Sequence, residues 1–227
     1  MKGGLIDRIR AIGHWRVVFR PARPLHQQLS FAECEQVVER NRVTLRGWDF
    51  PHISRRKDDG AGYGREDGFA ENWCDWIHSV EFWRMYRSGQ FVSYRSLEQD
   101  LDGTQTEDQR YLDVRDAIYS VSEFIEFAHR IAKDGLYRDG YEAEVSLVNT
   151  KGRFLQVGPG RMPFLDPRRT NLDTISLKTE VTPSQIHESA PATSLPLIIE
   201  LFSNFGWDPA SAQIGIDQEK FYRREFS

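Results

Sequence analysis

The stretch IYSVSEFIEFAHRI, residues 118–131, decides the fold class. Its apolar residues recur every three or four positions and are Ile118, Val121, Ile125, Ala128 and Ile131. This spacing places them along one side of an α-helix, which must bury that side against another element. We therefore expect a helix that ends near Gly135 and covers a β-sheet.

Segments that favour strands lie on both sides of this helix. We expect strands at residues 15–19, 43–48, 72–78, 90–94, 141–148, 153–157 and 174–181. The segments 141–148 and 153–157 flank the turn Asn-Thr-Lys-Gly at 149–152, which predicts a hairpin. Because strands and helices do not alternate regularly, the sequence predicts an α+β fold with a mainly antiparallel sheet and helices packed on one side.

Helical spacing and capping residues predict further helices. They cover residues 5–12, 30–41, 81–86, 191–205 and 217–224. At the start of the second one, Ser30 and Glu33 fit a capping box. For residues 81–86 a strand is the alternative. Residues 54–68 carry many charges and glycines, so we expect an exposed hairpin tip or a loop there.

The chain has 227 residues, which is enough to bury a core without disulfides or metal. We expect one α+β domain over residues 1–227, with a loosely attached C-terminal lobe at 183–227 as the alternative. The apolar runs are too short for a secretory segment or a membrane span. The sequence therefore predicts a cytoplasmic protein without membrane contact, in which Cys34 and Cys74 are reduced.

Motifs of several common catalytic sites are missing. The glycine-rich stretch at 60–68 does not end in the Gly-Lys-Ser/Thr of a phosphate-binding loop, and no helix is expected directly after it. The six histidines are scattered along the chain, and neither cysteine has a partner two to four residues away in a ligand pattern. We therefore expect no metal site and no cofactor.

Two acids allow an alternative interpretation. Glu142 and Glu144 fall on the same side of a predicted strand, with Lys151 across the turn. Two such carboxylates can hold Mg²⁺ beside a phosphodiester, as in a divergent metal-dependent nuclease. The simpler interpretation is a solvated strand face, so we assign no catalytic residue and do not take enzymatic activity as the leading expectation.

The stretch RGWDFPH, residues 46–52, is the main candidate for a binding site. Gly47 and Pro51 predict a structured corner that presents Trp48 and Phe50 to one side. The tryptophans that follow closely along the chain are Trp73, Trp76 and Trp83. Such an aromatic cluster is either part of the core or a partly open pocket that stacks on a base, a planar ligand or a peptide.

The pocket interpretation combines these aromatic faces with polar groups at their edges and with a basic loop. Its candidate residues are Arg46, Trp48, Asp49, His52, Arg55, Arg56, Lys57, Trp76, Glu81, Trp83 and Arg84. The net charge of −4 argues against extensive coating of nucleic acid, but a local basic patch can still contact phosphates.

Two segments, RGWDFPH at 46–52 and EFWRMYRSGQF at 81–91, resemble parts of a poorly characterised bacterial domain. That domain is associated with Schlafen-like proteins that carry an AlbA-type DNA-binding module. The resemblance covers residues 15–97. It implies a prokaryotic accessory or sensor domain in a stress or phage-defence context, and it implies no catalytic residues.

These features together predict a non-enzymatic binding, adaptor or sensor protein. Its aromatic corner and basic loop would recognise a protein partner or, alternatively, a nucleic acid. A small-ligand-binding domain is a further alternative, and the oligomeric state stays open.

Overall fold

The computed structural model describes residues 3–103, 106–158 and 161–225. The strands are β1 (His14–Pro21), β2 (Ala61–Glu66), β3 (Phe69–Asp75), β4 (Val80–Tyr86), β5 (Phe91–Ser96), β6 (Tyr111–Asp113), β7 (Tyr141–Val148), β8 (Phe154–Gln156) and β9 (Thr174–Val181). The helices are α1 (Leu5–Arg10), α2 (Phe31–Asn41), α3 (Val114–Lys133), α4 (Pro183–Ile186), α5 (Ala190–Ser203) and α6 (Ser211–Tyr222), with short 3₁₀ turns at η1 (Glu98–Asp100) and η2 (Glu107–Gln109).

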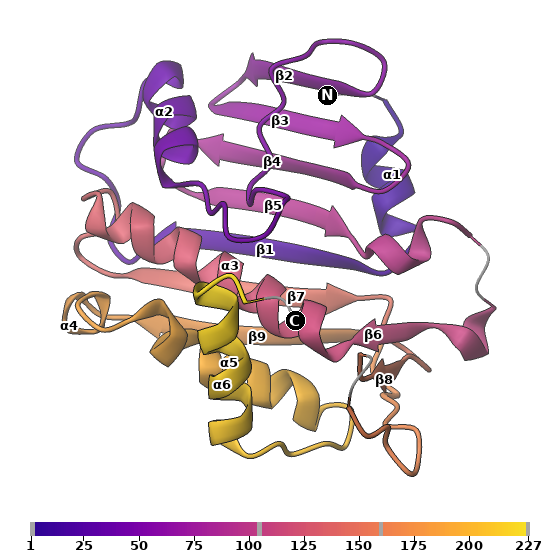
Figure 1. Cartoon of the computed structure of the whole chain (residues 1–227). Helices are drawn as coiled ribbons and strands as arrows, with labels where there is room; N and C mark the ends of the chain where they lie inside the picture. The colour runs from indigo at the N-terminus through magenta and orange to yellow at the C-terminus, as the bar shows by residue number, and fades with distance from the viewer. Residues whose placement is uncertain (1–2, 104–105, 159–160, 226–227) are drawn as a thin grey trace.

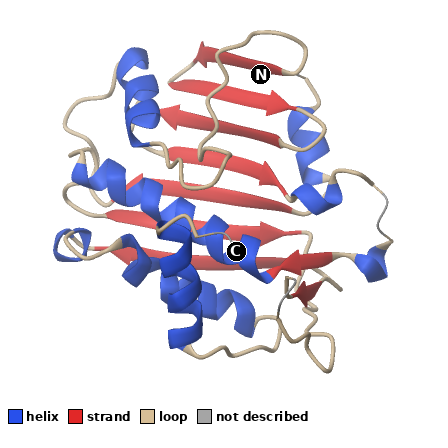
Figure 2. Cartoon of the chain, viewed as in Figure 1, coloured by secondary structure: helices blue, strands red, loops and turns tan. Residues whose placement is uncertain are grey.

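Seven strands form one antiparallel sheet in the order β2-β3-β4-β5-β1-β7-β9 (Figure 1). The strands β6 and β8 form a small parallel pair. Figure 2 shows α3, α5 and α6 in front of the strands, on one side of the large sheet. The predicted α+β fold, with an antiparallel sheet and helices on one side, is confirmed.

Strand β1 lies inside the sheet, between β5 and β7, and is antiparallel to both. Its alternation separates two faces, as expected for a strand. Trp15, Val17 and Phe19 belong to the main core on the helix-covered face. Arg16 and Arg20 point to the opposite face, where they are partly or fully exposed.

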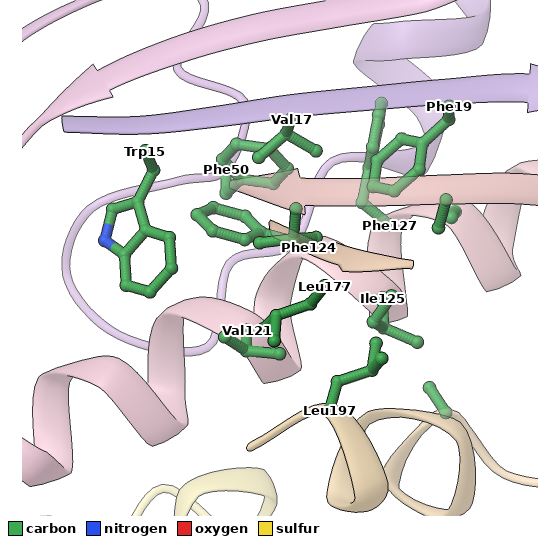
Figure 3. Close-up of a cluster of buried hydrophobic side chains, with 14 of the residues drawn as sticks. Trp15, Val17, Phe19, Phe50, Val121, Phe124, Ile125, Phe127, Leu177 and Leu197 are labelled. Atoms are coloured by element: carbon green, nitrogen blue, oxygen red, sulfur yellow. The ribbon is translucent and has the colours of Figure 1, made fainter. Parts of the chain in front are cut away.

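Helix α3 closes the main core, as its apolar stripe predicts. Most of its residues are buried, and Asp113 caps its start by accepting a hydrogen bond from the backbone N–H of Asp116. Figure 3 shows Phe127 of this helix beside Phe19 of β1, and Phe124 beside Phe50. Helices α5 and α6 pack on α3 from the other side.

The shorter helices α2 and α1 lie on opposite faces of the sheet, with α2 packed on the main core. Helix α2 begins with the predicted capping box, in which Ser30 and Glu33 each bind the other's backbone N–H. Helix α1 lies on the opposite face of the sheet, where Leu5 and Ile9 pack in a small separate cluster with Phe82.

The helix predicted at residues 81–86 is wrong, because this segment is strand β4. Its apolar residues alternate between two covered faces. Phe82 packs in the cluster with α1, whereas Trp83 belongs to the main core. Burial on both faces hides the simple alternation by which a strand is recognised.

Two other predictions about local structure are also wrong, and a third is confirmed only in part. Strand β7 pairs with β1 and β9 rather than with β8, so residues 141–157 do not form a hairpin. Residues 43–48 form a loop, with only an isolated bridge between Val43 and Phe50. The glycine-rich stretch 54–68 is a loop up to residue 60 and ends in the turn of the β2–β3 hairpin, in agreement with the prediction, but its residues 61–66 form strand β2. Turn residues mark where a strand ends but not which strand it pairs with.

In the part of the chain that the structure describes, no helix has both the length and the apolar character needed to cross a membrane. Cys34 and Cys74 are both buried free thiols.

The packing of α5 tests the domain organisation. Leu201 of α5 has no exposed surface, whereas Leu165 is 99% exposed. We expect Leu201→Ala to lower the free energy of unfolding by about 2–5 kcal/mol, because it leaves a cavity, and the matched Leu165→Ala to change it by less than about 0.5 kcal/mol. Urea denaturation measures both. One shifted transition would indicate a single cooperative domain, and a separate early transition would indicate a C-terminal lobe.

Candidate functional site

A row of polar side chains crosses one end of the sheet on its helix-covered face. The strand register places Glu81 of β4 opposite Arg95 of β5, and Arg95 opposite Trp15 of β1. Cys74 of β3 lies next to Glu81 in the same row. Glu81 and Arg95 are only 3% and 9% exposed. Charges buried to this extent need partners of opposite charge or hydrogen bonds.

The carboxylate of Glu123, from α3, meets this row and has no exposed surface. Arg46 binds both of its oxygens, with Nε–Oε1 and Nη2–Oε2 distances of 3.0 and 2.9 Å. Arg95 donates to Glu123 Oε2 at 3.3 Å and to Ser120 Oγ at 2.6 Å. Arg46 also pairs with Asp116. These bonds fasten α3 to both β5 and the loop that carries Arg46.

That loop, residues 44–49, is fixed at its base. Backbone hydrogen bonds of 2.7 and 2.9 Å join Val43 and Phe50, and both residues have no exposed surface. The loop therefore starts and ends in the core, while its tip reaches the polar row. There the indole N–H of Trp48 donates to Glu81 at 3.0 Å.

Three aromatic rings pack together at the loop. The Trp48 and His52 rings are stacked with centroids 4.2 Å apart, and Trp76 meets both edge-on at 5.5 and 5.3 Å. Burial lowers the pKa of His52, although the charge of Asp49 acts in the opposite direction. At neutral pH the stacked imidazole is therefore uncharged.

A pocket of about 400 Å³ lies beside the loop tip, and we name it the Trp48 pocket. Its walls include Trp15, Arg46, Trp48, Arg95, Ser96 and Asp116. The volume is within the range of pockets that hold small molecules, and the walls combine aromatic rings with a few polar groups.

Three of the tryptophans at or near the site, Trp15, Trp48 and Trp83, differ in what their indole N–H groups bind. Trp48 donates to a carboxylate, as described above, and Trp83 donates to the backbone oxygen of His52 at 2.8 Å. The indole N–H of Trp15 is buried and finds no hydrogen-bond partner among the described residues. In Figure 3 its nitrogen lies on the side of the ring away from Phe124. Leaving a buried donor unpaired costs about 1–3 kcal/mol.

The acid–base state of the polar row follows from its burial. Burial raises the pKa of Glu81 to about 7, although the charge of Arg95 and the hydrogen bond from Trp48 act in the opposite direction. Glu81 is therefore partly protonated near neutral pH. Burial also raises the pKa of the Cys74 thiol, which keeps it in the weakly nucleophilic protonated form.

The structure places some of the predicted residues together and others elsewhere. Those that meet at the loop are Arg46, Trp48, His52, Trp76 and Glu81. Asp49 pairs with Arg42 at 3.2 Å. Trp83 lies in the core. Arg84 points to the opposite face of the sheet and pairs there with Glu71 at 3.0 Å.

The basic loop belongs to a different pocket. Arg55 and Lys57 line a space of about 390 Å³ next to α2 and β2, and Arg56 is exposed. Arg55 also pairs with Glu39 of α2 at 2.7 Å. The aromatic corner and the basic loop are therefore two separate surfaces.

The acids of the nuclease alternative lie on the face of β7 that α3 does not cover. Glu144 accepts a hydrogen bond from Arg16 at 2.6 Å and lies 3.7 Å from Lys178, while Glu142 pairs in register with Glu180 of β9. Lys151 lies in the turn that follows β7. In residues 3–103, 106–158 and 161–225, no group of three or more His, Cys, Asp or Glu side chains is arranged to hold a metal ion.

Sequence reasoning missed several residues of this site, which are Trp15, Arg95, Asp116, Ser120 and Glu123. Two signals were available in the sequence. Arg95 lies on the same face of β5 as the buried Phe91, and Glu123 lies between the apolar residues Val121 and Phe124 of the predicted helix. Each places a charge where burial is expected.

No protein-family model, curated protein or solved structure matches this chain. Function is therefore inferred from the geometry of the site.

The raised pKa of Glu81 predicts a pH dependence of stability. Folding raises this pKa from its ordinary value of 4.5 to about 7, so the folded state holds the proton more tightly than the unfolded chain. The resulting stabilisation is present below pH 4.5 and is lost as the pH rises through 7, and it amounts to about 3 kcal/mol at most. Glu81→Gln keeps an acceptor for Trp48 and removes this titration.

Between pH 5 and 8, the stability of Glu81→Gln relative to the natural protein should therefore rise by about 2–3 kcal/mol. Urea denaturation at several pH values measures this difference. Glu98→Gln, at an exposed acid on the pocket rim, is the matched control and should show a change below about 0.5 kcal/mol. If the free energy of unfolding changes with pH in the same way for the natural protein and for Glu81→Gln, the pKa of Glu81 is not raised by folding.

The buried ion pairs predict unequal effects at two arginines. Arg46→Met keeps the apolar part of the side chain but removes the cation that pairs with Asp116 and one of the two that pair with Glu123. The free energy of unfolding should therefore fall by about 3–5 kcal/mol. Arg55→Met removes an exposed pair and should cost less than about 1 kcal/mol. Equal losses in a thermal or urea denaturation experiment would show that the Glu123 cluster contributes little.

Proposed function

We propose that this chain is a non-enzymatic binding protein of the sensor type, in which a small ligand occupies the Trp48 pocket. The observation that carries the proposal is the pocket itself, in which the partly exposed ring of Trp48 lies beside the polar side chains of Arg46 and Asp116. Asp116 uses one carboxylate oxygen for Arg46, and its side chain is 40% exposed. A ligand in the pocket can therefore donate a hydrogen bond to its second oxygen.

The way the loop is held supports a sensor role. Its base is fixed in the core at Val43 and Phe50, whereas Gly47 at the tip is exposed. A ligand beside Trp48 would alter the position of this tip. The exposed surface of the loop would then report pocket occupancy to a protein partner.

A protein partner agrees better with the charge distribution than a nucleic acid does. Arg55 of the basic loop already pairs with Glu39, and Arg65 on the same side pairs with Glu35. Acids next to these cations would repel phosphates. The resemblance of residues 15–97 adds a bacterial stress or phage-defence context to this proposal.

Indole NMR tests whether the pocket binds small molecules. Each of the six tryptophans gives an indole ¹H–¹⁵N signal, which single Trp→Phe variants assign. We expect some members of a library of neutral, cationic and anionic fragments to shift the signals of Trp15 and Trp48. The signal of Trp207, which packs on Phe164 and Phe202, should stay in place.

If no fragment at millimolar concentration shifts the Trp48 signal selectively, the Trp48 pocket is not a ligand site and the proposal fails. A shift of all indole signals together would indicate unfolding or aggregation and would equally count against it.

A further inference from the structure

Strand β9 lies at one edge of the large sheet, with β7 as its neighbour (Figure 1). An edge strand carries a row of backbone N–H and C=O groups that can pair with another strand. The strand at the other edge, β2, is partly closed, because Asp58 of the preceding loop donates to the C=O of Ala61 at 2.9 Å. Among the described residues, none pairs with β9 on its outer side.

The two ends of β9 show which residues direct their backbone groups outward. Just before the strand, the C=O of Asp173 accepts from the N–H of Thr150 at 2.9 Å, on the β7 side. At the other end, the C=O of Val181 faces Gly140, which directly precedes β7. Successive residues of a strand direct these groups to opposite sides, so the odd-numbered residues of β9 bond to β7. The outward-facing residues are the exposed, even-numbered ones, Thr174, Ser176, Lys178 and Glu180.

Two of these outward-facing residues carry opposite charges. The side chain of Lys178 is 70% exposed and lies 3.7 Å from Glu144. Glu180 lies opposite Glu142 of β7, and in the part of the chain that the structure describes it forms no ion pair. Like charges directly opposite each other destabilise a strand pair. A cation on the outer side of Glu180 would offset this repulsion.

A second β9 strand supplies that cation when it runs antiparallel to the first about a two-fold axis. Residues at equal distances on either side of the axis then lie opposite each other. An axis beside Thr179 places Lys178 of each copy opposite Glu180 of the other. An axis beside Lys178 or Glu180 would oppose like charges, and an axis beside Leu177 would oppose no pair of opposite charges. The charge pattern therefore favours the axis beside Thr179.

The backbone of β9 agrees with this register. Lys178 and Glu180 both direct their N–H and C=O groups outward, so each Lys178–Glu180 pair can exchange two hydrogen bonds. Thr179 bonds to β7, so its two copies form a pair without hydrogen bonds, with Cα atoms about 4.5 Å apart. On the face that the helices cover, the apolar Leu177 comes to lie opposite the apolar Val181.

We propose that two copies of this chain associate through β9, antiparallel about Thr179, and so join their sheets into one. The contact closes at two copies, because each β9 edge is then paired. The paired segment is short, so the dimer is reversible and exchanges with the monomer. This inference does not depend on the Trp48 pocket.

Sedimentation velocity of the natural protein tests the association. We expect a reversible monomer–dimer equilibrium with a dissociation constant of about 1–100 µM, as for a small interface. A monomer at every concentration up to about 500 µM, well above that range, would overturn the proposal. Species larger than a dimer would indicate pairing of β9 with β2, which does not close, and would overturn it as well.

Exchanging the two charges tests the register. Lys178→Glu and Glu180→Lys each turn both symmetric pairs from attraction to repulsion, so each should weaken the dimer at least about tenfold. The double variant Lys178→Glu/Glu180→Lys restores opposite charges and should return the dissociation constant to within about threefold of the natural value. Lys57→Glu, an equal charge change near the other edge, is the matched control and should have less than about a twofold effect. A double variant as weak as the single ones would show that this register is wrong.

Cysteines on the edge strand give an independent measurement. Thr179→Cys should form an intermolecular disulfide under mild oxidation, because disulfides join Cα atoms about 4.4–6.8 Å apart. Ser176→Cys is the control, since in this register its two copies lie about 20 Å apart along the strands. The natural Cys34 and Cys74 are buried. Non-reducing electrophoresis measures the crosslink, and equal crosslinking of the two variants, or crosslinking of neither, would overturn the proposed pairing.

Discussion

A carboxylate without solvent exposure on a helix is the constraint on which this structure depends. Glu123 would destabilise the core if it were left unpaired, because moving an isolated charge out of water is costly. Its two cationic partners come from distant parts of the chain, Arg46 in a loop and Arg95 in β5. The ion pairs of Glu123 with Arg46 and Arg95 therefore determine the path of the loop and the position of α3 on the sheet. They also determine where Trp48 meets Glu81.

Local signals were enough to predict most helices of this fold. The stripe from Ile118 to Ile131 and the capping box at Ser30 depend on residues a few positions apart, so the sequence displays them directly. Pairing between strands has no such local signal. Asn149 and Gly152 adopt positive φ angles, as the predicted turn requires, yet β7 pairs with β1 and β9. The packing of β4 between α1 and the main core likewise becomes visible only when the whole sheet is assembled.

In the candidate site, too, the local sequence predicts some features, whereas others depend on how the strands pair. The aromatic corner could be predicted because Trp48, His52 and their glycine and proline neighbours are contiguous in the sequence. Trp15, Arg95 and Glu123 could not be joined to it, because only the strand register and the crossing of α3 bring them together. Arg84 was grouped with the wrong surface for a similar reason, since a strand sends adjacent residues to opposite faces.

The position of β1 inside the sheet has a consequence for how the protein is made. This strand leaves the ribosome early, but its neighbours are β5, which begins at Phe91, and β7, which ends at Val148. Both edges of β1 therefore stay unpaired while most of the sheet is still being synthesised. Native contacts of such long sequence separation form slowly and leave apolar strand surface exposed in the meantime. The sheet can close around both edges of β1 only after Val148 has been synthesised.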